Sequence, residues 1–454
     1  VQAAMHLIGS SLQWLALASA ANARPPAPDS RHAHGQLMEH GLRWHERRWH
    51  AALCKALCLN DPWVDGDWST LSYQRALRRC WDQIRRRWVN DDLLICWERQ
   101  PFAHGSMRQC HRIKATRQGW KRPLYLLGKR YFNEAASIAA LEADVRMQMR
   151  AKEYGTRYSR EAGVPKSVDF VQAFMIHVID EGPVPPVFAS EAFIEGEFVK
   201  HSSNSGWIAD EVVRSTPHAF AHYTFEASNG EELVVDIQGV GDLYTDPQIH
   251  TREGGELYGK GNMGMRGIAL FFASHRCNAI CRRLRLHRFA TTAQTGPGTL
   301  PAAAATELPT LFSGQSTRRT DANLLRTGAN LLQVVPAQRR RDEPSASREA
   351  ELPAVPTLYA AVHHTLALLH ARHVHTGDEI LAPGVFASPV QGLFHLQESA
   401  SHGGVPAMLA LACLRLHRKP RKGVLLALVD ARLSPLPVDA AAALFYTESA
   451  ARRG

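Results

Sequence analysis

The segment at residues 233–250 constrains the fold of this chain more than any other part of its 454 residues. Its first residues are apolar and predict a buried strand that ends at Asp236, and Gln238 follows two residues later on the same face. Two glycines then turn the chain before Asp246. Two carboxylates and an amide at one strand end are the hard oxygen groups that a Mg²⁺–phosphate site needs. The same pattern also fits a tight β-turn whose aspartates face solvent.

The rest of the chain divides into regions by composition and periodicity. Residues 61–290 alternate strand-like and helix-like segments, which predicts an α+β core. We expect a flexible extension at 1–40, a basic amphipathic segment at 41–60, a flexible regulatory linker at 291–355 and a group of Ala- and Leu-rich helices at 356–454. These last helices, expected near 359–372, 388–403 and 405–416, suggest helix–turn–helix repeats that pack against one another.

Charge and cysteine usage limit the class of protein. The 53 Lys and Arg exceed the 43 Asp and Glu by 10, which allows an anionic partner but does not require one. Eight scattered cysteines are too few for a disulfide scaffold and predict reduced thiols in a cytoplasmic protein. No apolar run reaches 18 residues, and no aromatic RNA-binding pattern is present. We therefore expect no membrane partner and no direct contact with nucleic acid.

Two further features could bind an anionic ligand. Gly259, Gly261 and Gly264 have dinucleotide-loop spacing, but they follow a polar loop rather than a first strand, so a dinucleotide site is not favoured. A loop that cradles phosphate or a peptide backbone fits better, and a plain glycine loop that caps a helix fits as well. Lys129 falls on an apolar strand at 124–131, where a lysine either reaches solvent at the strand end or contacts an anion.

Histidine and cysteine residues late in the core have metal-ligand spacing. Cys277 and Cys281 lie at i and i+4 of a helix expected within 265–284, so both would face one side, and His275 can reach the same point. His222 is the best upstream candidate for a fourth ligand. Four protein ligands leave no open coordination position, which indicates structural rather than catalytic zinc. Buried free thiols beside a core histidine explain the pattern as well.

A basic segment at 41–58 carries Trp49 and Leu53 among arginines and lysines. An amphipathic basic helix of this kind suits an acidic groove such as that of calmodulin. A membrane surface, RNA or an ordinary exposed helix are the alternatives.

Several segments, taken in order, resemble the α-kinase family. They are residues 100–108, 144–149, 193–200, 203–206, 234–250, and the glycine loop with 266–272. The resemblance covers about residues 41–290 and implies an α+β, two-lobed protein-kinase-like domain with structural zinc in its C-lobe. It also implies phosphate transfer from ATP with Mg²⁺. The helices after 358 look like the start of Sel1-like repeats.

The resemblance also assigns roles to single residues. Lys129 matches the lysine that contacts the ATP phosphates, and Asp236 matches the catalytic aspartate that orients or deprotonates the substrate hydroxyl. The other matches are Glu191 and Ile194 at the adenine-binding hinge, Gln238 and Asp246 as Mg²⁺ ligands, His222, His275, Cys277 and Cys281 as zinc ligands, Gly259, Gly261 and Gly264 in the peptide-binding loop, and Lys166, Arg214 and Thr216 in a pocket for an autophosphorylated threonine.

The same resemblance implies a substrate and an activator, and the sequence also differs from the family pattern at some positions. It implies a Ser/Thr kinase that phosphorylates elongation factor 2 and slows translation elongation, activated by Ca²⁺–calmodulin with Trp49 as anchor and Leu53 one helical turn on. A kinase for another protein, such as myosin heavy chain, and a catalytically dead zinc-stabilised scaffold are the alternatives. Gly128 stands where a small apolar residue is expected, and Arg150 where a glutamate is expected, so the acidic partner of Lys129 is open. In the linker, Thr317 or Thr320 could be the threonine that fills the pocket.

Overall fold

The computed structural model describes the chain from residue 61 onward, with gaps. The described residues are 61–66, 68–105, 107–118, 123–132, 138–179, 185–209, 214–291, 355–376, 380–382, 385–386, 388–418 and 436–453. The predictions for 1–40 and 41–60, with Trp49 and Leu53, lie outside these residues. The linker prediction, with Thr317 and Thr320, lies almost wholly outside them as well.

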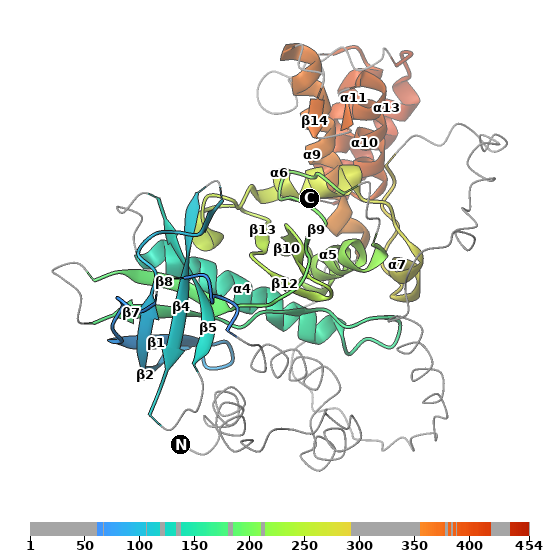
Figure 1. Cartoon of the computed structure of the whole chain (residues 1–454). Coiled ribbons are helices and arrows are strands. Elements are labelled where there is room, and N and C mark those ends of the chain that lie inside the picture. Colours follow the sequence, from blue (N-terminus) through green and yellow to red (C-terminus); the bar gives the residue numbers. More distant parts are fainter. Residues whose placement is uncertain are drawn as a thin grey trace, which may run out of the picture. The chain divides into compact units, whose positions relative to one another are not determined.

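An antiparallel sheet of seven strands forms the first part of the fold (Figure 1). Its order is β2-β1-β7-β8-β5-β4-β3, and β2 also pairs with β4, so the sheet curls back on itself. The strands are β1 Gln74–Asp82, β2 Arg87–Trp97, β3 Ala103–His104, β4 Arg108–Thr116, β5 Leu124–Tyr131, β7 Ala173–Val178 and β8 Val187–Ala192. Inward side chains such as Ile113, Leu126 and Phe188 alternate with more exposed ones and make one core.

Helix α4, Ile138–Tyr158, packs on this sheet and continues into a second core. Its first turns place Leu141, Val145 and Met149 against residues of β7 and β8. Its last turns place Tyr154 and Tyr158 in a separate cluster of aromatic residues. One helix with apolar residues along its length therefore joins the two cores that flank the candidate site.

The second core is built from short strands and helices. Strand β10, Glu232–Val235, pairs with β13, Gln248–Thr251, and a four-stranded sheet has the order β6-β12-β11-β9. The remaining elements are β6 Asp169–Phe170, β9 Phe198–Lys200, α5 Ser215–Ala227, β11 Gln238–Val240, β12 Leu243–Thr245, η1 Glu256–Tyr258, α6 Gly264–Ser274 and α7 Ala279–Arg283. The predicted α+β character of this region is confirmed.

The continuous helix expected within 265–284 is wrong. Helix α6 ends at Ser274, His275 is extended, and α7 begins only at Ala279. The Asn278 side chain accepts hydrogen bonds from the backbone N–H groups of Ile280 and Cys281, at 2.8 and 3.3 Å. Asparagine is a favoured N-cap, so Asn278 starts a new helix and leaves Cys277 outside it.

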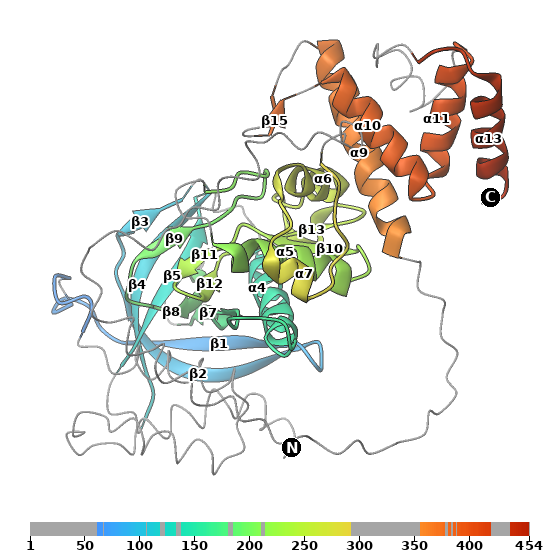
Figure 2. The same ribbon diagram turned by 90° about the vertical axis from the view of Figure 1, so that its right-hand side faces the viewer.

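Three of the C-terminal helices occur where the sequence predicts them, and a further helix, α13, lies beyond the predicted ones. These helices are α9 Val355–Thr376, α10 Pro389–Ser401, α11 Val405–Arg415 and α13 Ala440–Ala451, with a short pair β14 Ile380–Ala382 and β15 Val385–Phe386 between α9 and α10. Figure 2 shows α9, α10, α11 and α13 in succession. The first turns of α9 place Leu358, Tyr359 and Val362 in the same core as α6. None of the described helices combines the length and apolar character that crossing a bilayer requires.

Candidate functional site

Lys129 lies at the centre of a charged cluster between the two cores. Its ammonium is 2.6 Å from a carboxylate oxygen of Glu191 on β8 and 2.7 Å from Asp246, which follows β12. Burial opposes the charge on this ammonium, but the two carboxylates outweigh it, so the pKa of Lys129 is raised. These two residues are the acidic partners that the sequence left open. The cluster lines a pocket with Arg108, Asp144 and Gln148.

Glu191 is held in place by neighbours on two other elements. The Gln148 amide donates to it at 2.7 Å, and the Thr245 hydroxyl donates to the same oxygen. The amide oxygen of Gln148 accepts the backbone N–H of Asp246 at 3.1 Å. Gln148 therefore connects β8 to the segment that carries Asp246. Gln148 falls within the segment 144–149, but its spacing alone predicts no role for it.

Arg108 is a second cation that forms an ion pair with Asp246. Its guanidinium lies 3.0 Å from Asp144 and 3.1 Å from Asp246, and the Tyr131 hydroxyl donates to Asp144 at 2.9 Å. Burial would raise the pKa of Asp246, but Lys129 and then Arg108 hold it well below its usual range. Asp246 is therefore ionised, which a role as metal ligand requires. No residue-level prediction had included Arg108 or Asp144.

Asp236 and Gln238 meet Asp246 as the sequence predicts. The Gln238 amide donates to the backbone oxygen of Asp246 at 3.1 Å and lies 3.4 Å from the Asp236 carboxylate. Asp236 also forms an ion pair with Lys200 at 2.8 Å. Burial raises the pKa of Asp236 despite this lysine. The carboxylate and amide oxygens gathered here fit Mg²⁺, a hard cation that prefers such ligands.

The backbone around these residues is strained. Asp236 and Asp246 have φ values of 58° and 48°, in the left-handed region that costs a non-glycine residue about 1–3 kcal/mol. Between them Gly239 has φ of 154°, and a Cβ there would approach the Leu243 carbonyl to 2.2 Å. Only glycine fits this turn. The turn that carries both aspartates therefore has a backbone conformation that depends on this glycine.

The glycine loop is fixed beside this site rather than free. The Asn262 side chain accepts hydrogen bonds from the N–H groups of Thr251 and Gly264, at 3.0 and 3.1 Å. Gly259 and Gly264 have φ values of 71° and 61°, and a Cβ on Gly261 would collide with Gln248. The loop therefore leads from β13, the strand that follows Asp246, into the first turn of α6. Its binding of a peptide stays a prediction.

The remaining residues of the sequence prediction lie in two places. Ile194 is half-buried in the segment after β8, three residues beyond Glu191. The Arg214 guanidinium donates to the Gly241 carbonyl at 3.0 Å, and Thr216 is buried in the first turn of α5. Lys166 is exposed before β6, which runs parallel to β12. Since parallel strands begin at one edge, Lys166 and Arg214 approach the same end of that sheet.

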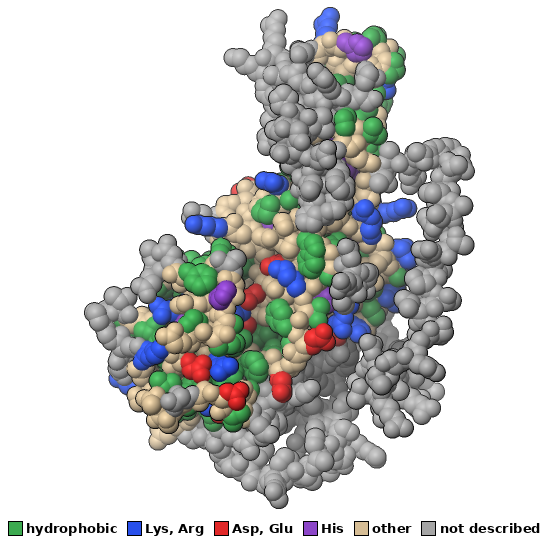
Figure 3. Space-filling model, turned by 45° about the horizontal axis from the view of Figure 1, so that its top comes forward, with side chains coloured by type: hydrophobic (Ala, Val, Ile, Leu, Met, Phe, Trp, Pro, Cys, Tyr) green, Lys and Arg blue, Asp and Glu red, His purple; other side chains and the backbone are tan. Residues whose placement is uncertain are grey.

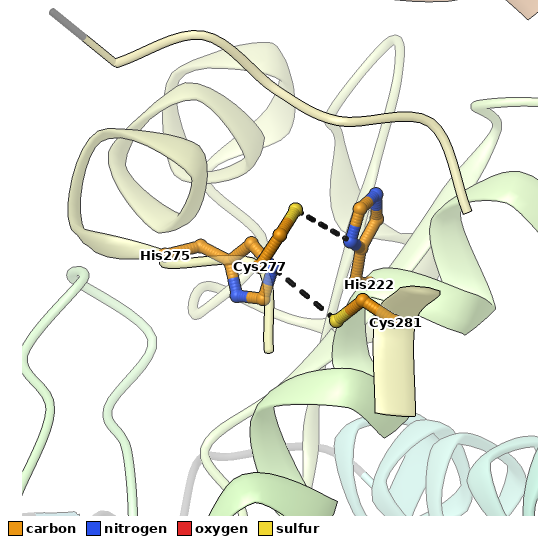
Figure 4. Close-up of side chains that lie close together, drawn as sticks. All are labelled: His222, His275, Cys277 and Cys281. Atoms are coloured by element: carbon orange, nitrogen blue, oxygen red, sulfur yellow. Dashed lines mark hydrogen bonds between the residues drawn. The ribbon is translucent and has the colours of Figure 1, made fainter. Parts of the chain in front are cut away.

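The four predicted zinc ligands converge (Figure 4). The Cys277 sulfur is 3.8 Å from His222 Nδ1, and the Cys281 sulfur is 3.8 Å from His275 Nε2. Zn–N bonds of about 2.0–2.1 Å and a Zn–S bond of about 2.3 Å put tetrahedral N and S ligands roughly 3.6 Å apart. The Cys281 thiol, followed by the two imidazoles, lowers the pKa of the Cys277 thiol despite burial. This donor set fits zinc.

A hydrogen-bond chain orients His222 from outside the cluster. Tyr359 of α9 donates its hydroxyl to Glu226 at 2.6 Å, so the 2.8 Å contact between His222 Nε2 and that hydroxyl has His222 as donor. The Nδ1 lone pair of His222 then faces the two thiols, which is the tautomer a metal ligand needs. No pattern in the sequence relates Tyr359 to this site.

Charged side chains on the surface are mixed. In the described part of the face shown in Figure 3, Lys and Arg (blue) are interspersed with Asp and Glu (red), and neither sign forms a continuous patch.

Comparison with known proteins gives consistent matches over the region of the site. Residues 103–281 match the profile of the Alpha-kinase family. Eukaryotic elongation factor 2 kinase from Homo sapiens is 44% identical over 246 residues, which cover 53% of this chain and 33% of that protein. Myosin heavy chain kinase C from Dictyostelium discoideum is 39% identical over 206 residues, covering 45% of this chain and 26% of that protein.

A crystal structure of the alpha-kinase domain of myosin-II heavy chain kinase A in complex with AMP-PNP aligns at 31% identity with a TM-score of 0.45, covering 48% of this chain and 98% of that one. The chain spans about a third of the length of the elongation factor 2 kinases it matches.

Proposed function

Residues 103–281 form an alpha-kinase domain similar to that of the elongation factor 2 kinases, and from this premise we propose that the chain transfers the γ-phosphate of ATP to a threonine of elongation factor 2. The observation that supports phosphate transfer is that Lys129 and Asp246 line one pocket as an ion pair, while Gln238 contacts both Asp246 and Asp236. The presence of Lys129, Asp236, Gln238 and Asp246 together argues against a dead scaffold.

Each residue has a distinct part in this reaction. Lys129 is a cation beside the pocket and would contact phosphate oxygens, while Glu191 keeps its ammonium oriented. Mg²⁺, when bound with ATP, neutralises phosphate charge, and Gln238 and Asp246 carry the oxygens that would hold it. Arg108 holds Asp246 in position and ionised. The segment around Glu191 and Ile194 would receive the adenine through backbone groups.

Asp236 would act on the substrate hydroxyl. The threonine oxygen forms a bond to the γ-phosphorus while the bond from that phosphorus to the leaving oxygen of ADP breaks, and the hydroxyl proton passes to the Asp236 carboxylate. Lys200 lies 2.8 Å from this carboxylate and fixes its orientation. The raised pKa of Asp236 is consistent with a proton acceptor. The loop with Gly259, Gly261 and Gly264 would position the peptide.

The other parts of the proposal concern metals, regulation and location. The closed cluster of His222, His275, Cys277 and Cys281 would hold structural zinc that fixes α7 to α5. Ca²⁺–calmodulin would bind residues 41–58. Lys166, Arg214 and Thr216 would receive a phosphothreonine from the linker, and the C-terminal helices would form Sel1-like repeats. The protein would act in the cytoplasm, where the cysteine usage also suits it.

Elongation factor 2 is favoured over myosin heavy chain as substrate. The elongation factor 2 kinases of Homo sapiens and Caenorhabditis elegans are each 44% identical to this chain, against 39% for myosin heavy chain kinase C. Because the latter match is also substantial, a myosin heavy-chain kinase is the second candidate. The two are separated by offering both proteins to the same enzyme preparation.

The experiment measures ³²P transfer by the purified chain to elongation factor 2 and to a myosin heavy-chain tail, with and without Ca²⁺–calmodulin. We expect calmodulin-stimulated labelling of elongation factor 2 and its loss in Asp236→Ala. Asp92→Ala, which removes an exposed carboxylate from β2, is the matched control and should leave labelling intact. Equal labelling by Asp236→Ala and the parent chain would overturn the catalytic assignment, and labelling of the myosin tail alone would overturn the substrate.

A further inference from the structure

A second group of histidines lies outside the candidate active site and outside the cysteine cluster. It gathers where the segment after α7 meets α9 and α10. Its members are His287, His363, His395, Glu398 and His402. The proposed kinase reaction uses none of them.

The donor atoms of this group have metal-ligand spacing. His363, Glu398 and His402 each offer one atom, and these atoms lie within 4.8 Å of one another. His287 Nε2 lies 3.3 Å from His402 Nε2. Two imidazole nitrogens on one tetrahedral zinc are also about 3.3 Å apart, because each Zn–N bond is about 2.0–2.1 Å. Two imidazoles and one carboxylate thus lie around a common point, and a third imidazole, that of His287, borders it at His402.

The rings are held by contacts at their other nitrogens. His402 Nδ1 lies 2.7 Å from the Glu398 carbonyl, which can only accept, so Nδ1 carries the proton and Nε2 carries a lone pair. His363 Nδ1 is 2.8 Å from His395 Nδ1, and the His363 ring stacks on Phe289 at 4.1 Å. Contacts of this kind fix the tautomer and orientation of metal-binding histidines.

The two histidines at the centre of the group are shielded from solvent. The side chains of His363 and His395 are almost fully buried.

We infer that His363, Glu398 and His402, with His287 as the fourth ligand, form a second divalent-metal site that takes Zn²⁺. Imidazole and carboxylate without thiolate suit zinc, and imidazole dominance disfavours Mg²⁺ or Ca²⁺. The ion would connect the segment after α7 to two of the C-terminal helices. His287 is itself fixed to α5, because its backbone N–H donates to Glu226 at 2.6 Å. The site would therefore fasten α9 and α10 to the core that carries the cysteine cluster, whether or not the chain is a kinase.

The first test is metal content. The full chain is equilibrated with Zn²⁺, passed over a desalting column and analysed by mass spectrometry of its metals. We expect two zinc ions in the parent chain and one in a double variant, Glu398→Gln with His402→Gln. A control double variant, His417→Gln with Glu448→Gln, makes the same chemical changes at side chains outside the group and should keep two. One ion in the parent chain, or equal content in the parent and the first variant, would overturn the inference.

A second measurement does not depend on how the variants fold. Stepwise addition of Co²⁺ to the metal-free parent chain should give one equivalent with thiolate-to-cobalt charge-transfer absorption and another with ligand-field bands only. Absence of the second type of spectrum would overturn the site. Zinc should also raise the thermal unfolding midpoint of the control variant further than that of the Glu398/His402 variant. Equal rises would show that these histidines only pack against one another.

Discussion

The ammonium of Lys129 lies 2.7 Å from the Asp246 carboxylate, although 117 residues separate them in the chain. This contact joins β5 of the large sheet to the segment that follows β12, and so it connects the two halves of the pocket. It also pairs the cation proposed to contact phosphate with a carboxylate proposed to hold Mg²⁺. Binding of Mg²⁺–ATP would exchange this ion pair for contacts of both residues with the nucleotide and its metal.

Lys129→Met should abolish phosphate transfer. The substitution removes the cation from the pocket and leaves Glu191 and Asp246 without a shared partner, so kcat/KM should fall by about 10²–10³-fold or more. Lys114→Met is the control, because Lys114 is also a strand lysine with a carboxylate partner, Asp61, but lies on β4 away from Asp246. Transfer that survives in Lys129→Met, or that is lost equally in both variants, would contradict the assigned role.

Gly128→Ala should destabilise the fold. A Cβ at this position would come within 2.4 Å of Ile113 Cδ1 and 2.9 Å of Phe188, which explains why glycine stands before the lysine. Such overpacking costs about 1–3 kcal/mol, measured as the free energy of unfolding in urea. Gly105→Ala is the control, because its nearest neighbour atom is 3.9 Å away. Adding Ile113→Val, which removes the clashing methyl, should restore part of the loss, and no restoration would point to another cause.

The sequence predicts contacts within one short segment better than contacts between distant strands. Asp236, Gln238 and Asp246 lie within a single strand–turn–strand, so their convergence follows from local geometry. The partnership of Lys129 with Glu191 depends on β5 lying beside β8, an order that no local pattern encodes. The spacing of His275, Cys277 and Cys281 predicts the ligand cluster. The single helix expected to carry these residues is wrong, because Asn278 caps a new helix there. The contact between Tyr359 and His222 cannot be predicted from local patterns, because the two residues are 137 positions apart in the chain.

Stability should fall as the pH is lowered from 7.5 to 5 partly because of His250. This imidazole is fully buried, donates to the Asn204 carbonyl and accepts the Met263 N–H. Burial lowers its pKa to about 4, against 6.5 for an ordinary histidine. Below about pH 6.5 the imidazole of His250 is therefore protonated in the unfolded chain but stays neutral in the folded chain. This difference lowers the free energy of unfolding by about 2 kcal/mol at pH 5.

His250→Gln is the test of this pH dependence. Urea unfolding at pH 7.5 and pH 5 should show a difference between the two pH values that is about 2 kcal/mol smaller in the variant than in the parent chain. His104→Gln removes an exposed histidine from β3 and should keep the parental difference. An unchanged difference in His250→Gln would mean that other groups cause the acid sensitivity.

Tyr359→Phe should weaken both the fold and the proposed zinc site. The lost hydroxyl leaves the His222 N–H without its acceptor, since the next acceptor, Glu226, is 3.4 Å away. The free energy of unfolding should drop by about 1–3 kcal/mol. Loss of an outer partner of a metal-bound histidine should lower zinc affinity about 10–100-fold, measured by competition with a coloured chelator. Tyr446→Phe on α13 makes the same change away from the cluster and should match the parent chain in both measurements. If Tyr359→Phe holds zinc as tightly as that control, α9 does not support the metal site and only packs beside it.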